Sequence, residues 1–429
     1  MRIDTGRTTG MSVYTMAALM LAVFTVSIGF GVVLPLLPYL IERLIGPSVT
    51  VAQVARHTGL LTAVYTLSLF LFAPLWGRQS DRRGPRGVLL VGVLGFGVTM
   101  LIFSFVESLV AVYVERFLSG MFAAAVTPVA AAVIGSAIKS ERERARRLAF
   151  LSMAGVAGFL LGPMLGVAVT RLAAGVLTFA MPAGSVAIPL AVTAILAFFT
   201  SAVVAIAIPS GAGSERTPKS PFTSDQAIGR LVSKLLSLTF IVSAGIGVFE
   251  VGLALRGKQE LGLSPYQIAL MFTECSLVMI VMQTIVFSPW FKPDSTRWVI
   301  APSLAVLAAG LLLIPVAWNF TTTLIVIGAV AGSAGILSPV LTYWISAKTG
   351  SAQGRELGKQ TAVSSLGVTA GSAAGGLLFV VGSVPGISFM LTAGLVIVGF
   401  VISLGLTRML VLSNSSLLSS SELSHSKNN

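Results

Sequence analysis

The sequence has few of the side chains on which redox and metal chemistry depend. Its 429 residues include one cysteine, Cys275, and two histidines, His57 and His425. A single cysteine cannot form a disulfide within the chain, and two histidines far apart in sequence give no metal-binding pattern. The sequence also lacks a recognisable nucleotide-binding loop. We therefore expect no cofactor, and we exclude redox and metal chemistry.

Charged residues are also scarce. They make up 10% of the chain, whereas a soluble domain has about 25%. Hydrophobic residues make up 55%, and the mean hydropathy is +0.94. A surface with so little charge would not keep a chain of this size in solution, so its main solvent must be lipid. This composition excludes a soluble enzyme, a disordered chain and a nucleic-acid-binding protein.

Long apolar runs recur along the whole sequence. A hydrocarbon core about 30 Å thick needs about 20 helical residues per crossing. The runs lack the alternation of apolar and polar residues that a membrane β-barrel requires, so we predict helices. The predicted fold class is all-α integral membrane, with twelve transmembrane helices in two six-helix bundles. The predicted spans are residues 14–40, 57–76, 87–106, 110–138, 148–170, 186–208, 231–255, 265–290, 297–317, 320–345, 358–381 and 385–408.

Positive charge is distributed unevenly between the loops. Most of the 28 Lys and Arg residues lie in the two tails and in the loops after every second span. Cytoplasmic loops of membrane proteins carry the excess of Lys and Arg. Both termini are therefore predicted to be cytoplasmic, in a bacterial-type cytoplasmic (inner) membrane. The net charge of +13 then reflects topology rather than nucleic-acid binding.

A polar stretch divides the chain into two halves. Residues 209–230 are rich in Pro, Gly and Ser, and cannot cross a membrane. They separate an N-terminal bundle, residues 1–208, from a C-terminal bundle, residues 231–410. Residues 411–429 form a Ser-rich tail that we expect to be disordered.

The two halves show a weak internal repeat. Asp81, Gly158 and Gly162 have matching residues 213 positions later, which are Asp294, Gly371 and Gly375. Glycine spacing in apolar helices can also coincide by chance. The near-constant offset nevertheless favours two repeated bundles around a central site, as in many transporters.

The loop between the second and third spans carries a compact motif. Glycines permit a tight turn, an acidic side chain can face a helix N-terminus, and arginines can pair with acids across an interface. A simpler alternative is a basic inner loop that only fixes topology. The motif residues are Gly77, Asp81, Arg82, Gly84 and Arg86.

These five residues resemble a signature of the major facilitator superfamily, which is close to G-x-x-x-D-R/K-x-G-R-R/K. Pro85 departs from it, because the family usually has Arg there. In that family the loop is thought to latch the inner gate when the carrier faces outward. The resemblance implies that Asp81 faces the eleventh span near Gly358. It also implies that Arg82 and Arg86 pair with acids such as Glu141 or Glu143.

The fourth span contains an ionisable pair, Glu115 and Arg116. An Arg inside hydrocarbon costs several kcal/mol unless it is paired or hydrated. With Gly120, Arg116 resembles the family's R-x-x-x-G element, which is associated with proton coupling. Alternatively, Arg116 extends to the outer interface and pairs with Glu115 or Glu107.

The fifth span contains Gly158, Gly162, Pro163 and Gly166. Glycines four apart allow close approach of a neighbouring helix, and an internal proline kinks the helix. The pattern resembles the antiporter motif of the family's exporters, although helix packing alone can produce such spacing. The end of the first span, from Gly31 to Pro38, resembles the exporters' G-x-x-x-P-x-x-P ending.

Two further acids lie within the second half, Glu250 in the seventh span and Glu274 in the eighth. A carboxyl group shielded from water can bind a proton and release it when water or a cation arrives. The alternative for Glu250 is a pair with Arg256 or Lys258 at the rim. For Glu274 it is a neutral acid that is hydrogen-bonded within the bundle.

These features lead to one functional hypothesis and two alternatives. The preferred hypothesis is a monomeric secondary active transporter, not an enzyme. It would exchange protons for a small organic solute, amphiphilic and drug-like or a secreted metabolite such as a siderophore. Proton coupling would depend on Glu274, Arg116, Glu115 and Glu250. The alternatives are a proton-coupled nutrient importer of the same fold and a non-transporting membrane receptor or sensor.

Overall fold

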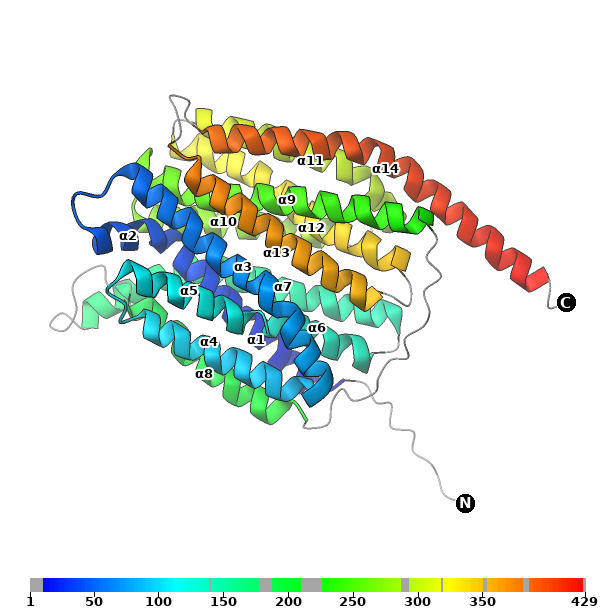
Figure 1. Ribbon diagram of the computed structural model, residues 1–429, viewed down its shortest axis with the longest axis horizontal. Helices are drawn as coiled ribbons and strands as arrows, with labels where there is room; N and C mark the ends of the chain where they lie inside the picture. Colours follow the sequence, from blue (N-terminus) through cyan, green and yellow to red (C-terminus); the bar gives the residue numbers. More distant parts are fainter. Residues whose placement is uncertain are drawn as a thin grey trace, which may run out of the picture. The chain divides into compact units, whose positions relative to one another are not determined.

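The structure is a computed structural model in which nearly every described residue is helical (Figure 1). Within the described residues, eleven helices are long and apolar enough to cross a membrane. Helix α13 lies where the predicted eleventh span lies, but its polar first turns and many Gly and Ser residues lower its hydropathy. The prediction of an all-α integral membrane protein is confirmed. The described residues are 11–138, 140–176, 187–209, 226–286, 293–317, 319–349, 353–380 and 386–426.

The helices of the first half match the predicted order of spans. The first span is α1 and α2 joined by a 3-10 turn, η1, and the fourth is α5 and α6 in succession. The bounds are α1 Val13–Val33, η1 Leu34–Leu36, α2 Leu37–Ile45, α3 Val51–Arg83, α4 Pro85–Phe103, α5 Leu109–Ala123, α6 Val126–Ala137, α7 Glu141–Val176 and α8 Ala187–Ala207.

The second half continues in the same way. Helix α14 extends through residues 411–426, for which the sequence predicts disorder; several leucines in this stretch favour helix. The bounds are α9 Gln226–Gln259, α10 Pro265–Val286, η2 Pro293–Thr296, α11 Arg297–Leu313, η3 Ile314–Val316, α12 Phe320–Thr349, α13 Gln353–Leu377 and α14 Ile387–Ser426.

Contacts divide the chain into two compact units. Unit 1 comprises Met1–Leu36 and Leu67–Pro218, and unit 2 comprises Leu37–Thr66 and Lys219–Asn429. The chain therefore changes unit once between η1 and α2 and again within α3. The domain boundaries expected from the sequence stay predictions, and linker residues 210–225 lie outside the described residues.

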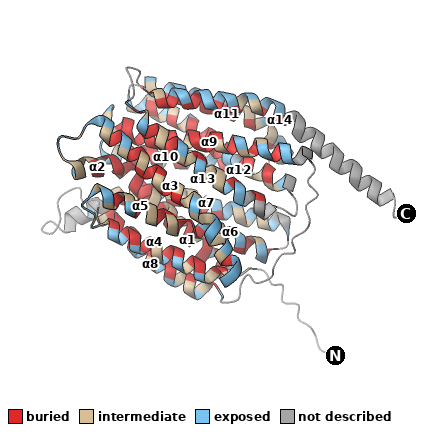
Figure 2. Ribbon diagram, viewed as in Figure 1, coloured by how far each residue is buried: buried red, intermediate tan, exposed pale blue. Residues whose placement is uncertain are grey.

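Apolar side chains cover both the inside and the outside of each unit. Buried residues occupy the helix faces that pack on other helices, and exposed residues occupy the remaining faces (Figure 2). Large apolar side chains are nevertheless exposed along many helices; Ile206, for example, is 87% exposed and Val110 is 74% exposed. Exposed apolar surface of this extent requires lipid as its solvent.

The closest packing in unit 1 joins α1 to α7. A Cβ atom added to Gly162 would lie 2.7 Å from the carbonyl oxygen of Ile28, and one added to Gly158 would collide with the carbonyl oxygen of Phe24. The backbones of the two helices are therefore in direct contact. This is the packing that small residues four positions apart permit.

Unit 2 repeats this arrangement between α9 and α13. An added Cβ at Gly367 would lie 2.6 Å from the carbonyl oxygen of Phe240, and one at Gly371 would collide with that of Ala244. Gly158 packs on Phe24 of α1 as Gly367 packs on Phe240 of α9, so these two glycines correspond by packing. The sequence offset of 213 residues instead matches Gly158 with Gly371, which lies one helical turn later. Glycines recur every four residues on both helices, so the sequence leaves this register ambiguous.

Candidate functional site

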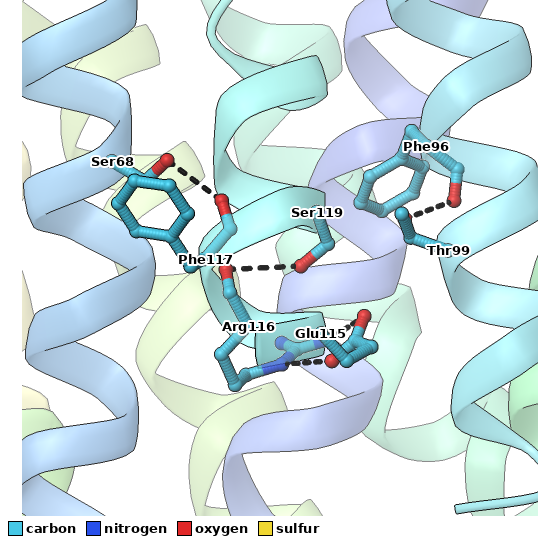
Figure 3. Close-up of polar contacts among 7 residues, drawn as sticks. All are labelled: Ser68, Phe96, Thr99, Glu115, Arg116, Phe117 and Ser119. Atoms are coloured by element: carbon cyan, nitrogen blue, oxygen red, sulfur yellow. Dashed lines mark hydrogen bonds and ion pairs between the residues drawn. The ribbon is translucent and has the colours of Figure 1, made fainter. Parts of the chain in front are cut away.

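The carboxyl group of Glu115 and the guanidinium group of Arg116 form a buried ion pair on α5 (Figure 3). Arg116 donates from Nε to Oε2 of Glu115 at 2.7 Å and from Nη2 to Oε1 at 3.0 Å. Both side chains are 2% exposed. The structure therefore pairs Arg116 with Glu115 inside unit 1, and the side chain does not extend to the interface.

Nearby aromatic and hydroxyl groups enclose this pair. The guanidinium carbon of Arg116 lies 4.7 Å from the ring centroid of Phe103, which suits a cation–π contact. The hydroxyl of Ser119 donates to the carbonyl oxygen of Arg116 at 3.3 Å. The hydroxyl of Ser68 on α3 donates to the carbonyl oxygen of Phe117, the residue after Arg116, at 2.7 Å (Figure 3). The two opposite charges thus balance each other, and the pair packs against Phe103 of α4.

The two acids in unit 2 have different surroundings. Oε2 of Glu250 and Oε2 of Glu274 are buried, and neither has a hydrogen-bond partner among the described residues. Neither of the pairings considered for Glu250 is present, because Arg256 pairs with Glu260 at 3.1 Å and Lys258 pairs with Glu42.

The carboxyl group of Glu274 faces α12. A Cβ atom added to Gly328 would lie 3.3 Å from Oε1 of Glu274. The missing side chain at Gly328 therefore leaves the space that this oxygen occupies. Glu274 is half-buried, unlike the neighbouring Cys275, which is 3% exposed. A half-buried carboxyl group without a partner can be reached by a proton or by a cationic group of a solute.

Four large aromatic side chains lie inside unit 2 and do not face lipid. Tyr65, Phe249, Phe272 and Trp344 are all buried, between 1% and 5% exposed. Trp344 donates from Nε1 to the hydroxyl of Thr296 at 3.1 Å. Ordinary core packing accounts for these four side chains.

The loop motif contains two glycines, Gly77 and Gly84, and only Gly84 forms the turn. Helix α3 continues through Gly77 to Arg83, and the turn occurs at Gly84, whose φ of 84° suits glycine. Gly84 is the N-cap of α4 and Pro85 follows it at the first helical position, where the missing amide donor is harmless. The departure from the family signature at Pro85 thus fits the start of a helix.

One charged residue of the motif, Arg86, has a partner other than the acids inferred from the resemblance. Arg86 donates from Nη2 to the carbonyl oxygen of Ala205 near the end of α8, at 2.6 Å. Glu143 binds Arg147 on its own helix at 2.7 Å. Asp81 and Arg82 are exposed. The expected approach of Asp81 to Gly358 would join unit 1 to unit 2 and stays a prediction, and the side chain of Glu141 lies outside the described residues.

The helix motif Gly158, Gly162, Pro163 and Gly166 packs on α1. Pro163 lies against Gly31, since a Cβ added there would be 3.2 Å from Cδ of the proline ring. Gly166 has more room, with its closest contact at 3.7 Å from Val32. The motif therefore has a packing role in unit 1, next to the point where α1 gives way to η1.

Sequence reasoning missed two parts of this region. Phe103 and Ser119 complete the surroundings of the ion pair; the i, i+3 spacing of Arg116 and Ser119 could have indicated the second. Glu42 was not considered as the partner of Lys258. No sequence signal connects these two, because 216 positions separate them.

Comparisons with known proteins identify the family. The family model described as Major Facilitator Superfamily matches residues 19–292 and, in a second match, residues 235–417. Multidrug resistance protein 2 of Bacillus subtilis (strain 168) is 26% identical over 360 residues, which cover 83% of this chain and 86% of the relative. Quinolone resistance protein NorA of Staphylococcus aureus (strain MRSA252) is 24% identical over 372 residues, covering 83% and 88%.

A solved structure shares the fold. The crystal structure of the human organic anion transporter MFSD10 (TETRAN) superposes with a TM-score of 0.71 at 20% identity, covering 91% of this chain and 99% of that one. At this identity the similarity concerns the fold alone. The family matches confirm the resemblance inferred from the sequence motifs. The chain belongs to the Major Facilitator Superfamily and is a multi-pass membrane transporter rather than an enzyme.

Proposed function

We propose that this transporter is a proton-coupled antiporter that exports a small organic solute. The observation that carries the proposal is the pair of carboxyl groups in unit 2 whose buried oxygens have no partner, Glu250 and Glu274. An unpaired carboxylate in a medium of low dielectric is costly, and a proton or a cationic group removes that cost. A site of this kind exchanges one cation for another.

Glu274 is the first candidate for the proton carrier. It is half-buried and it faces Gly328, so its carboxyl group has room for an exchange partner. Glu250 is the second candidate. Glu115 and Arg116 already neutralise each other in an ion pair of 2.7 Å. They would contribute to coupling when Glu115 takes up a proton, because Arg116 would then lose its partner and bind another group.

The proposed direction of transport and the proposed class of solute rest on the names of the relatives. Their names describe multidrug and quinolone resistance, which supports export of drug-like amphiphilic solutes. A secreted metabolite such as a siderophore belongs to the same proposal. Asp81 and Arg82 would act at the inner gate, with both termini in the cytoplasm of a bacterial cell and the chain working as a monomer.

Transport by inverted membrane vesicles tests the proposal. Vesicles are first acidified inside, and a quinolone or ethidium is then added outside. An exporter dissipates the pH gradient as the solute enters, whereas an importer of nutrients and a non-transporting receptor leave the gradient unchanged. Glu274→Gln should abolish the dissipation.

The matched control is Glu107→Gln, an exposed acid in the loop before α5. It removes the same charge outside the helices and should exchange protons as the wild type does. Normal exchange by Glu274→Gln would refute the assignment of the proton to Glu274, and the same test of Glu250→Gln would then decide whether the proton belongs to Glu250.

A further inference from the structure

Helices α10 and α12 of unit 2 touch at one level and separate at another. Two glycines of α12 show where they touch, because a Cβ atom added to each measures the space that is left. One added to Gly335 would lie 2.9 Å from Cα of Met279, so the two backbones are in contact there. One added to Gly332 would meet only side chains, Val278 at 3.5 Å and Met282 at 3.6 Å, which is ordinary van der Waals contact.

One turn earlier on α12, at Gly328, the space is open except for one atom. A Cβ atom added there would have a single neighbour within 4 Å outside its own turn of helix, Oε1 of Glu274 at 3.3 Å. Both residues are partly exposed, so the space reaches the surface of the unit. We call this space, which is bounded by Oε1 of Glu274 and the main chain of Gly328, the α10–α12 recess.

The glycines beside the second unpaired acid, Glu250, leave no such space. The nearest ones on α9 are Gly247 and Gly252. An added Cβ at Gly247 would collide with the carbonyl oxygen of Val368 on α13, and one at Gly252 would collide with the ring of Phe389 on α14. Among the described glycines that flank the two acids, only Gly328 leaves open space at a carboxyl oxygen.

The groups at the recess suit an organic ammonium group better than a metal ion. Among the described residues, no three His, Cys, Asp or Glu side chains lie close enough together to hold a metal ion, which generally takes several such ligands. Oε2 of Glu274 is buried and has no hydrogen-bond partner in the described part of the chain. The carboxylate therefore needs both a counter-charge and hydrogen-bond donors. A protonated amine supplies both in one small group, and its hydrogen bonds to a carboxylate are charge-assisted.

The recess also limits the shape of the group that can enter. It has the width of one missing side chain at Gly328, and Val278 and Met282 fill the gap between the helices one turn further on. A primary ammonium group has three N–H donors and no substituent other than its own chain, so it fits such a space. A quaternary ammonium group has no N–H donor and carries alkyl groups where the donors would be.

Apolar surface lies close to the recess. Leu277, three residues after Glu274, is 53% exposed, and Ile325, three residues before Gly328, is 70% exposed. Residues three apart on a helix are neighbours on its surface. The apolar part of an amphiphilic solute therefore has apolar side chains to rest on while its amine occupies the recess.

We propose that the α10–α12 recess is a binding subsite for a protonated primary or secondary amine, and that Gly328 sets its selectivity. The ammonium group donates to Oε1 of Glu274 across the space that the absent side chain leaves. Quaternary cations of the same charge bind less tightly, because they lack N–H donors and are bulkier. The inference rests on the proposed exchange at Glu274, and it adds the chemical class of the charged group that the solute carries.

Two ligands with the same charge and the same aromatic body test this selectivity. Benzylammonium has N–H donors, and benzyltrimethylammonium has methyl groups in their place. Binding of each radiolabelled compound is measured on the purified full-length protein in lipid nanodiscs, and empty nanodiscs correct for partition into lipid. Hydrogen bonds to a charged group change binding by about ten- to a hundredfold. The wild type should prefer benzylammonium by a factor in that range, and equal binding of the two compounds would overturn the proposal.

Substitutions at Gly328 test whether this residue sets the preference. Gly328→Ala places a methyl group 3.3 Å from Oε1 of Glu274 and should remove most of the preference, and Gly328→Val should remove the rest. Gly332→Ala is the matched control one turn away, because its methyl group would make only ordinary contacts with side chains. It should keep the preference of the wild type. A preference that survives in both Gly328 variants, or that Gly332→Ala loses equally, would overturn the role of Gly328. Thermal unfolding of each variant shows that the fold is intact.

The binding test can fail independently of the vesicle test, because it uses neither a pH gradient nor a solute gradient. If the preference is found but the vesicles keep their pH gradient, the recess binds amines and proton exchange is wrong. If the vesicles exchange protons for a quinolone but both Gly328 variants bind the two ligands as the wild type does, proton exchange is right and the recess is wrong.

Discussion

Buried carboxyl groups have opposite surroundings in the two units. In unit 1, Glu115 is fully neutralised by its neighbour Arg116 through two hydrogen bonds. In unit 2, Glu250 and Glu274 each have a buried oxygen without a partner. The same residue type is thus paired in one unit and has an oxygen without a described partner in the other. The difference can be tested, because loss of the pair in unit 1 should lower stability, whereas substitution of Glu274 in unit 2 should impair transport.

The largest effect on stability is expected at the ion pair in unit 1. Arg116→Met leaves Glu115 buried without a partner and should lower the free energy of unfolding in detergent by about 3–5 kcal/mol. The double variant Glu115→Leu/Arg116→Met removes both charges and should recover most of that loss, because an apolar pair of similar size packs well there. Denaturant or thermal unfolding checks both. A double variant as unstable as Arg116→Met would mean that packing with Phe103, rather than charge, holds this region.

The comparison of units extends to their closest helix contacts. Gly162→Ala in unit 1 and Gly367→Ala in unit 2 each insert a methyl group against a main-chain oxygen, at 2.7 and 2.6 Å. Overpacking of this kind should lower the free energy of unfolding by about 1–3 kcal/mol. Equal losses would show that both units depend to the same extent on close contact between helix backbones.

Gly135→Ala is the matched control on α6, because an added Cβ meets nothing within 4 Å there. It should raise stability by about 0.5–1 kcal/mol, since glycine is a poor helix former. A loss at Gly135 equal to that at Gly162 would show that the glycine effect does not come from the contact between helices.

Substitution of the unpaired acids of unit 2 should have a small effect on stability. Glu274→Gln keeps the shape of the side chain and breaks no hydrogen bond or ion pair among the described residues, so the free energy of unfolding should change by less than about 1 kcal/mol. Transport should nevertheless be lost in the vesicle assay. A loss of stability as large as that of Arg116→Met would instead assign Glu274 a structural role.

The spans and their order were predictable from the sequence. The thickness of the bilayer fixes the length of an apolar run, so hydropathy alone finds helices such as α4 and α8. The turn at Gly84 was also predictable, because few other residues adopt its backbone conformation. These features depend on local composition, which a sequence displays directly.

Features that depend on distant partners were not predictable. The burial of the Arg116–Glu115 pair was not predictable, because it depends on residues of another helix, such as Phe103 on α4. The partner of Lys258 lies 216 positions away, at Glu42. The register of α7 and α13 is ambiguous because glycines recur at every turn, and only the contacts with α1 and α9 decide it.

A third carboxyl environment, an exposed ion pair, should give the smallest effect on the free energy of unfolding. Glu143 is 49% exposed and binds Arg147 one turn along α7 at 2.7 Å. Water screens such a pair, so Glu143→Gln should lower the free energy of unfolding by only about 0.3–0.5 kcal/mol, and less in high salt. Unfolding at low and high ionic strength measures this. If the loss matched that of Arg116→Met, burial would not be what separates the three carboxyl environments, and the contrast between the units would need another cause.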